Sequence, residues 1–230
     1  SKTNGKIIWV ATEVFDDTDL PIGNRIDTFL GLAIHEGCHV LYTDFSAYKG
    51  ITNGIVKFIE NILEDERIER ELGQKKPGLA NFLKASKYYY FDRYSQKMKD
   101  EGKTEGLETF PRLMNAIISL VRYPKTVEMS DLEEFADTLL QVRELLTPYP
   151  ASTAQCVETA EKIFDIIRQY LQDEEKEKQK QQASDSQQDD QASDESGEGS
   201  GSSGQSLQPQ SSGQQSKPKR MTSRQIAKKI

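Results

Sequence analysis

The stretch that decides how this chain folds is Gly31-Leu-Ala-Ile-His35-Glu36-Gly37-Cys38-His39-Val-Leu41. Apolar residues at helical spacing predict a helix over about 25–42, with this stretch in its second half. His35 and His39 are the two histidines of the chain, and a helix projects them from one face about one turn apart. Both imidazoles could therefore reach one Zn²⁺ at about 2.0–2.1 Å.

Glu36 follows the first of these histidines, which is the spacing of an HExxH motif. A carboxylate at this position can take a proton from a metal-activated water, so we expect Glu36 to act as the catalytic base. The competing interpretation is that His35 and His39 are ordinary helix histidines. Their spacing, with apolar residues on both sides, favours the metal site.

A catalytic zinc usually has three protein ligands, and no third histidine exists here, so we expect a carboxylate. A second helix over about 53–72, with Asn53 as N-cap, carries many acidic residues. Glu64 is the preferred third ligand and Glu60 the alternative. Asp65 or Asn61 could form a hydrogen bond to a ligand histidine without binding the metal itself.

The pattern of His35-Glu-x-x-His39, then Thr43-Asp44-Phe45, then Asn61-Ile-Leu-Glu64-Asp65-x-Arg67-Ile-Glu69 resembles a known family. It is similar to the gluzincin-type metallopeptidase domain of phage and bacterial proteins that also carry a von Willebrand factor A domain. The layout also resembles that of the cobaltochelatase subunit with such a domain after an acidic linker. The resemblance covers about residues 25–78.

This resemblance implies a helical zincin-like fold with Glu64 in the ligand helix. It further implies a linker that leads to a von Willebrand factor A domain, and a bacterial or phage-infected cell as the setting. The chelatase-like layout implies an AAA+ ATPase as a possible partner.

The remaining sequence predicts a mainly α (α+β) fold. Residues 6–15 are rich in β-branched and aromatic side chains and predict a strand. Gly73 is expected to end the second helix, and Ser130 with Glu133 has the pattern of a capping box. Further helices are expected near residues 79–100, 107–122, 131–146 and 151–172.

Composition divides the chain into three parts. Residues 1–172 form the predicted metallopeptidase domain, since apolar residues almost vanish after Leu171. Residues 173–216 are expected to be a disordered acidic, Gln-, Ser- and Gly-rich linker, because they cannot bury enough apolar surface. The mixed charges of 173–180 could also prolong the preceding helix. Residues 217–230 predict the start of a further region.

The net charge and the cysteine content limit which partners and which cellular location we expect. A formal net charge of −7 argues against a nucleic-acid partner, and no apolar run is long enough for a membrane span. Two distant cysteines provide no disulfide framework, which favours a cytoplasmic location.

Two functions follow as hypotheses. The first is a zinc-dependent metallopeptidase that hydrolyses peptide bonds in a protein or peptide substrate. The alternative is a non-catalytic, zinc-stabilised interaction module that works with an AAA+ ATPase. Glu36 favours the enzyme, because a structural site needs no general base.

Overall fold

The computed structural model describes residues 1–100, 108–124 and 133–189. Its helices are α1 (Ile22–Tyr42), α2 (Gly54–Lys75), α3 (Pro77–Asp100), α4 (Thr109–Arg122), α6 (Ala136–Leu145) and α7 (Thr153–Asp189). The predicted mainly α fold is confirmed. None of the described helices is both long and apolar enough to cross a membrane.

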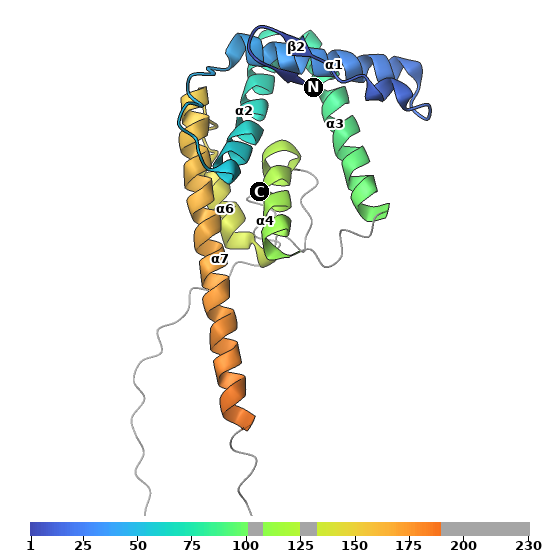
Figure 1. The fold of residues 1–230 in the computed structure, drawn as a ribbon. Coiled ribbons are helices and arrows are strands. Elements are labelled where there is room, and N and C mark those ends of the chain that lie inside the picture. Colours follow the sequence, from blue (N-terminus) through green and yellow to red (C-terminus); the bar gives the residue numbers. More distant parts are fainter. Residues whose placement is uncertain (101–107, 125–132, 190–230) are drawn as a thin grey trace, which may run out of the picture.

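Helix α2 is central because it contributes to two apolar clusters. Its first half packs against α4, α6 and α7, where the fully buried side chains include Ile59, Leu63, Leu113, Leu139 and Ile163. Its second half joins α1 and α3 through Cys38, Ile68, Leu72 and Leu83. Figure 1 shows α1 lying across the ends of α2 and α3, with α7 beside α2.

A close approach fixes how α1 crosses α3. Gly31 lies so near α3 that a Cβ atom there would sit 2.1 Å from the carbonyl oxygen of Phe82 and 2.6 Å from Ser86 Oγ. Only a residue without a side chain fits this contact. The crossing holds α1 so that its histidines point toward α2.

The helix predictions are largely confirmed, with shifts at the ends. Asn53 caps α2 as expected, since its side chain accepts hydrogen bonds from the amides of Ile55 and Val56 at 2.9 and 3.3 Å. Gly73 does not end the helix, which continues to Lys75. Its absent Cβ would meet Ala80 at an ordinary 3.9 Å, so nothing there forces a break. Ser130 of the predicted capping box lies outside the described residues.

The predicted strand over residues 6–15 is mostly wrong. Only Ile8–Trp9 (β2) is extended in a ladder, and it pairs antiparallel with Lys2–Thr3 (β1), with Thr3 opposite Ile8. Residues Glu13–Asp16 form a 3₁₀ turn instead. The partner strand is too short to continue a ladder, so β-propensity alone did not make a longer strand.

Helix α7 continues past the expected end near residue 172 to Asp189, so the alternative that residues 173–180 prolong this helix is confirmed. Glu, Lys and Gln are good helix formers, and oppositely charged side chains pair along this stretch. Lys178 reaches Glu174 at 2.7 Å and Lys176 reaches Asp173 at 3.1 Å. The rest of the predicted linker, from residue 190, and the region 217–230 lie outside the described residues.

Candidate metal centre

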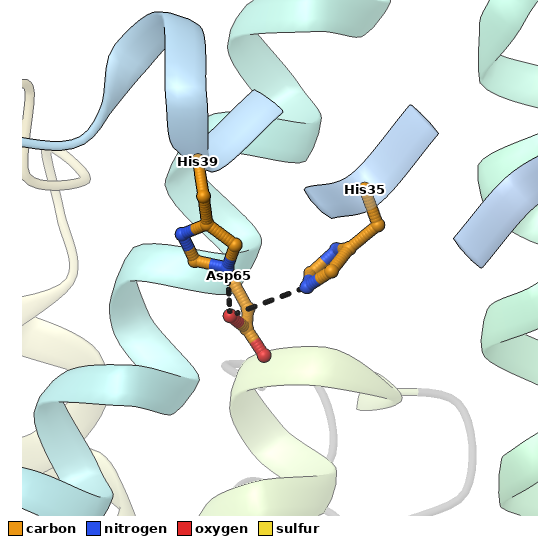
Figure 2. A group of neighbouring side chains, drawn as sticks. All are labelled: His35, His39 and Asp65. Carbon is orange, nitrogen blue, oxygen red and sulfur yellow. Dashed lines mark ion pairs between the residues drawn. The ribbon is translucent and has the colours of Figure 1, made fainter. Parts of the chain in front are cut away.

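His35 and His39 lie one turn apart on α1, and both rings face the same residue of α2. Figure 2 shows the two imidazoles projecting toward the carboxylate of Asp65. Asp65 Oδ1 lies 3.2 Å from His39 Nε2 and 3.6 Å from His35 Nε2. The three side chains are only partly exposed, and their ligand atoms all lie within 4.8 Å of one another.

A hydrogen bond fixes the tautomer of His35. Its Nδ1 lies 2.9 Å from Glu69 Oε1. Burial alone would raise the pKa of Glu69, but the hydrogen bond from His35 and the charge of Arg122 lower it to about 2. Glu69 is therefore a carboxylate that can only accept. In the neutral imidazole Nδ1 must then carry the proton, which leaves the Nε2 lone pair facing Asp65.

The tautomer of His39 follows from a longer chain of hydrogen bonds. Thr43 Oγ1 donates its single proton to Glu64 Oε1 at 2.8 Å. The same oxygen lies 3.0 Å from His39 Nδ1, so it must accept from that nitrogen. His39 Nε2 is then also a lone pair that faces Asp65.

With both imidazoles neutral, two nitrogen lone pairs and one carboxylate oxygen therefore converge. Asp65 Oδ1 is buried and faces His35 Nε2 and His39 Nε2. A buried carboxylate oxygen is costly unless a cation, either a protonated histidine or a metal ion, lies beside it. A tetrahedral zinc with bonds of 2.0–2.1 Å separates its ligands by roughly 3.3–3.4 Å, close to the 3.2 and 3.6 Å found here. The donor set fits a zinc ion.

The surrounding charges favour a cation at the same place. Burial by itself lowers the pKa of His35, yet the bond to Glu69 and the charge of Asp65 raise it above its ordinary value. Positive charge, whether from a proton or from a metal ion, is therefore stabilised beside these residues.

Glu36 is buried on α1 between the two histidines in sequence. Burial raises the pKa of its carboxyl, while His35 and His39 oppose that shift. This is the environment of a carboxyl group that can both accept and release a proton.

Glu64, the predicted third ligand, is not brought into this group. Its side chain is fully buried, and Oε1 accepts from Thr43, from Thr153 at 3.0 Å and from Arg67 at 2.6 Å. Oε2 accepts from Arg67 Nε at 2.8 Å. These four hydrogen bonds engage both oxygens of the Glu64 carboxylate. Whether Glu64 or Asp65 binds an ion stays a prediction, and the geometry favours Asp65.

The other two residues proposed from the sequence lie elsewhere. Glu60, the alternative ligand, is buried with Oε1 lacking a hydrogen-bond partner. Burial and the charge of Glu64 raise its pKa to about 8, so at neutral pH it is mostly a neutral acid and a poor metal ligand. Asn61 is exposed, and it does not reach the histidines.

Four supporting residues received no role in the sequence analysis. Glu69 follows Asp65 by four residues and Thr43 follows His39 by four, so helical spacing could have suggested both. Arg122 on α4 donates to Glu69 Oε1 at 2.8 Å, and Thr153 on α7 donates to Glu64. These two come from distant parts of the chain, and no local pattern predicts them.

No family model, curated protein or solved structure matches the chain.

Proposed function

We propose that the chain is a zinc-dependent peptidase whose metal ligands are His35, His39 and Asp65. One observation carries the proposal. The Nε2 atoms of His35 and His39 lie 3.6 and 3.2 Å from Asp65 Oδ1, which is buried, and the three ligand atoms lie within 4.8 Å of one another. In the HExxH sequence Glu36 directly follows the proposed ligand His35.

Each residue has a separate task in this proposal. A bound zinc would lower the pKa of a water molecule and polarise the peptide carbonyl. Glu36 accepts the proton of the attacking water and returns it to the leaving amine. Glu69 and Thr43 hold the two imidazoles in the tautomer that presents Nε2. Orientation by such outer partners commonly changes metal affinity by about 10–100-fold.

A second candidate is the non-catalytic, zinc-stabilised module that works with an AAA+ ATPase. The hydrogen bonds around the centre support it, since His35–Glu69 joins α1 to α2, Arg122–Glu69 joins α4 to α2, and Thr153–Glu64 joins α7 to α2. A metal ion would then hold helices together without cutting a bond. The buried Glu36 has no task in such a module, which is why the peptidase is preferred.

Elemental analysis tests the metal centre first. Purified wild-type chain, supplied with zinc and dialysed, should retain about one zinc, as expected for three protein ligands. Asp65→Asn and the His35→Ala/His39→Ala double variant should retain none. A folded wild-type chain without zinc would sink both candidate functions.

Peptide cleavage then separates the two candidates. The zinc-loaded chain is incubated with a mixture of random peptides, and new termini are identified by mass spectrometry. The peptidase proposal expects cleavage that Glu36→Gln abolishes while zinc stays bound. Bound zinc with no cleavage beyond the Glu36→Gln background would favour the interaction module.

A further inference from the structure

Residues of α2 and α3 line an open pocket of about 260 Å³. This is below the roughly 300–1,000 Å³ of small-molecule sites, so it suits one side chain or the end of a peptide. The lining residues that matter are Glu66, Glu69 and Arg70 from α2, and Lys84, Lys87 and Tyr88 from α3.

Glu69 connects this pocket to the metal centre. It lines the pocket, and its Oε1 accepts the hydrogen bond from His35 Nδ1 at 2.9 Å. The wall of the pocket is therefore in direct contact with a proposed zinc ligand. A group bound in the pocket would lie against the carboxylate that orients a proposed zinc ligand.

The carboxylates of the pocket already have cationic partners. Glu66 accepts from Arg70 at 2.9 Å and from Lys87 at 2.7 Å. Glu69 accepts from His35 and from Arg122, which lies behind the wall, at 2.8 Å. The lining thus holds two carboxylates against three cations, in a chain whose formal net charge is −7. This local excess of positive charge runs against the overall charge of the molecule.

Lys84 supplies the cation that remains available. Its side chain is exposed at the pocket, and its ammonium group lies 5.9 Å from the centre of the Tyr88 ring. Among the described residues, no carboxylate forms an ion pair with it. A carboxylate that enters the pocket would meet this ammonium group without displacing an existing partner.

We propose that this pocket binds a carboxylate of the peptide substrate. The inference rests on the proposed peptidase function and specifies its substrate class. The carboxylate belongs either to an acidic side chain or to a free C-terminus, since both offer the same two oxygens to Lys84.

Peptide binding tests the pocket without turnover. Zinc-loaded Glu36→Gln chain is titrated, at about 0.05 M salt where screening is weak, with a short glutamate-containing peptide and its glutamine counterpart. Each peptide is used with a free and with an amidated C-terminus. Tighter binding of the glutamate peptide identifies a side-chain carboxylate, and tighter binding of the free over the amidated form identifies a C-terminal one.

The expected preference for the carboxylate form is about fivefold, since an exposed ion pair contributes up to about 1 kcal/mol. Lys84→Gln should abolish this preference and Lys84→Glu should reverse it. Lys57→Gln is the matched control, because Lys57 is an exposed lysine near the other end of α2. This control should keep the full preference.

Two results would overturn the pocket assignment: equal binding of the carboxylate and amide forms, or a preference that persists in Lys84→Glu. Failure of the peptidase proposal has a different signature. In that case the binding preference depends on Lys84 as expected, but wild-type chain cleaves none of the four peptides and none of the random mixture.

Discussion

Glu64 and Asp65 are adjacent on α2, yet their carboxylates have opposite surroundings. Glu64 accepts four hydrogen bonds from Thr43, Thr153 and Arg67, whereas Asp65 Oδ1 is buried beside the two imidazoles. Successive residues of a helix point about 100° apart, so one carboxylate faces Arg67 and the other faces the histidines. This difference assigns the two residues separate tasks.

Substitution of these two carboxylates should therefore have different effects. Asp65→Asn should lose more zinc affinity than the roughly 10–100-fold typical of outer partners, while the metal-free chain stays folded. Glu64→Gln removes one of the two carboxylates that pair with the buried Arg67 and leaves only Glu71 at 2.9 Å, so it should cost stability, by up to about 3–5 kcal/mol. Zinc titration and thermal unfolding in a chelator measure the two effects. A Glu64→Gln chain of normal stability that binds no zinc would instead make Glu64 the ligand.

Arg122 and His35 both donate to the same oxygen of Glu69. Glu69→Gln should weaken zinc binding by about 10–100-fold, because a neutral amide holds the His35 tautomer less firmly than a carboxylate. Zinc affinity measured by competition with a chelating dye gives the change. Glu161→Gln, an exposed position on α7, is the control and should leave the affinity unaltered. An unchanged affinity in Glu69→Gln would contradict a positioning role.

Replacement of Glu60 by glutamine should increase the stability of the chain, and the increase should grow as the pH rises. Its pKa is raised to about 8 by burial and by Glu64, above the ordinary value of an unfolded chain. Between about pH 4.5 and pH 8 the folded state therefore keeps a proton that the unfolded state releases, and this group costs stability as the pH rises. Glu60→Gln removes that cost, because glutamine does not titrate.

The gain should be measured as melting temperature in a chelator. Glu60→Gln should match wild type near pH 4.5 and exceed it by at least about 2–4 °C at pH 8, which corresponds to about 1 kcal/mol. Glu158→Gln is the exposed control and should show no such trend. If the difference in melting temperature between Glu60→Gln and wild type is the same at both pH values, titration of Glu60 is not its cause.

Gly31 and Gly73 should respond in opposite directions to alanine. At Gly31 the new Cβ would overlap the Phe82 carbonyl oxygen at 2.1 Å, and such overpacking typically costs about 1–3 kcal/mol. At Gly73 the nearest atom is Ala80 Cβ at 3.9 Å, so better helix propensity should stabilise α2 by about 0.5–1 kcal/mol. Chemical denaturation measures both. A stable Gly31→Ala chain would show that α1 and α3 can move apart.

Local sequence was sufficient for part of this protein. The spacing of apolar residues predicted α1 to α4, α6 and α7, and the side chain of Asn53 predicted the start of α2. The pairing of His35 with His39 on one face follows from the helical repeat alone. These features depend on residues within one or two turns of each other, which is the range over which sequence patterns act.

The tertiary structure decided what the sequence left open. From sequence, Glu60, Glu64 and Asp65 were all carboxylates on one helix, and only the rotation of α2 against α1 selects which one faces the histidines. Arg122 and Thr153 reach the centre from α4 and α7, across long sequence separations that no local pattern encodes. The rotation is set by the close contact at Gly31 and by the burial of Ile68 and Leu72, because packing fixes the orientation of a helix and its own sequence does not.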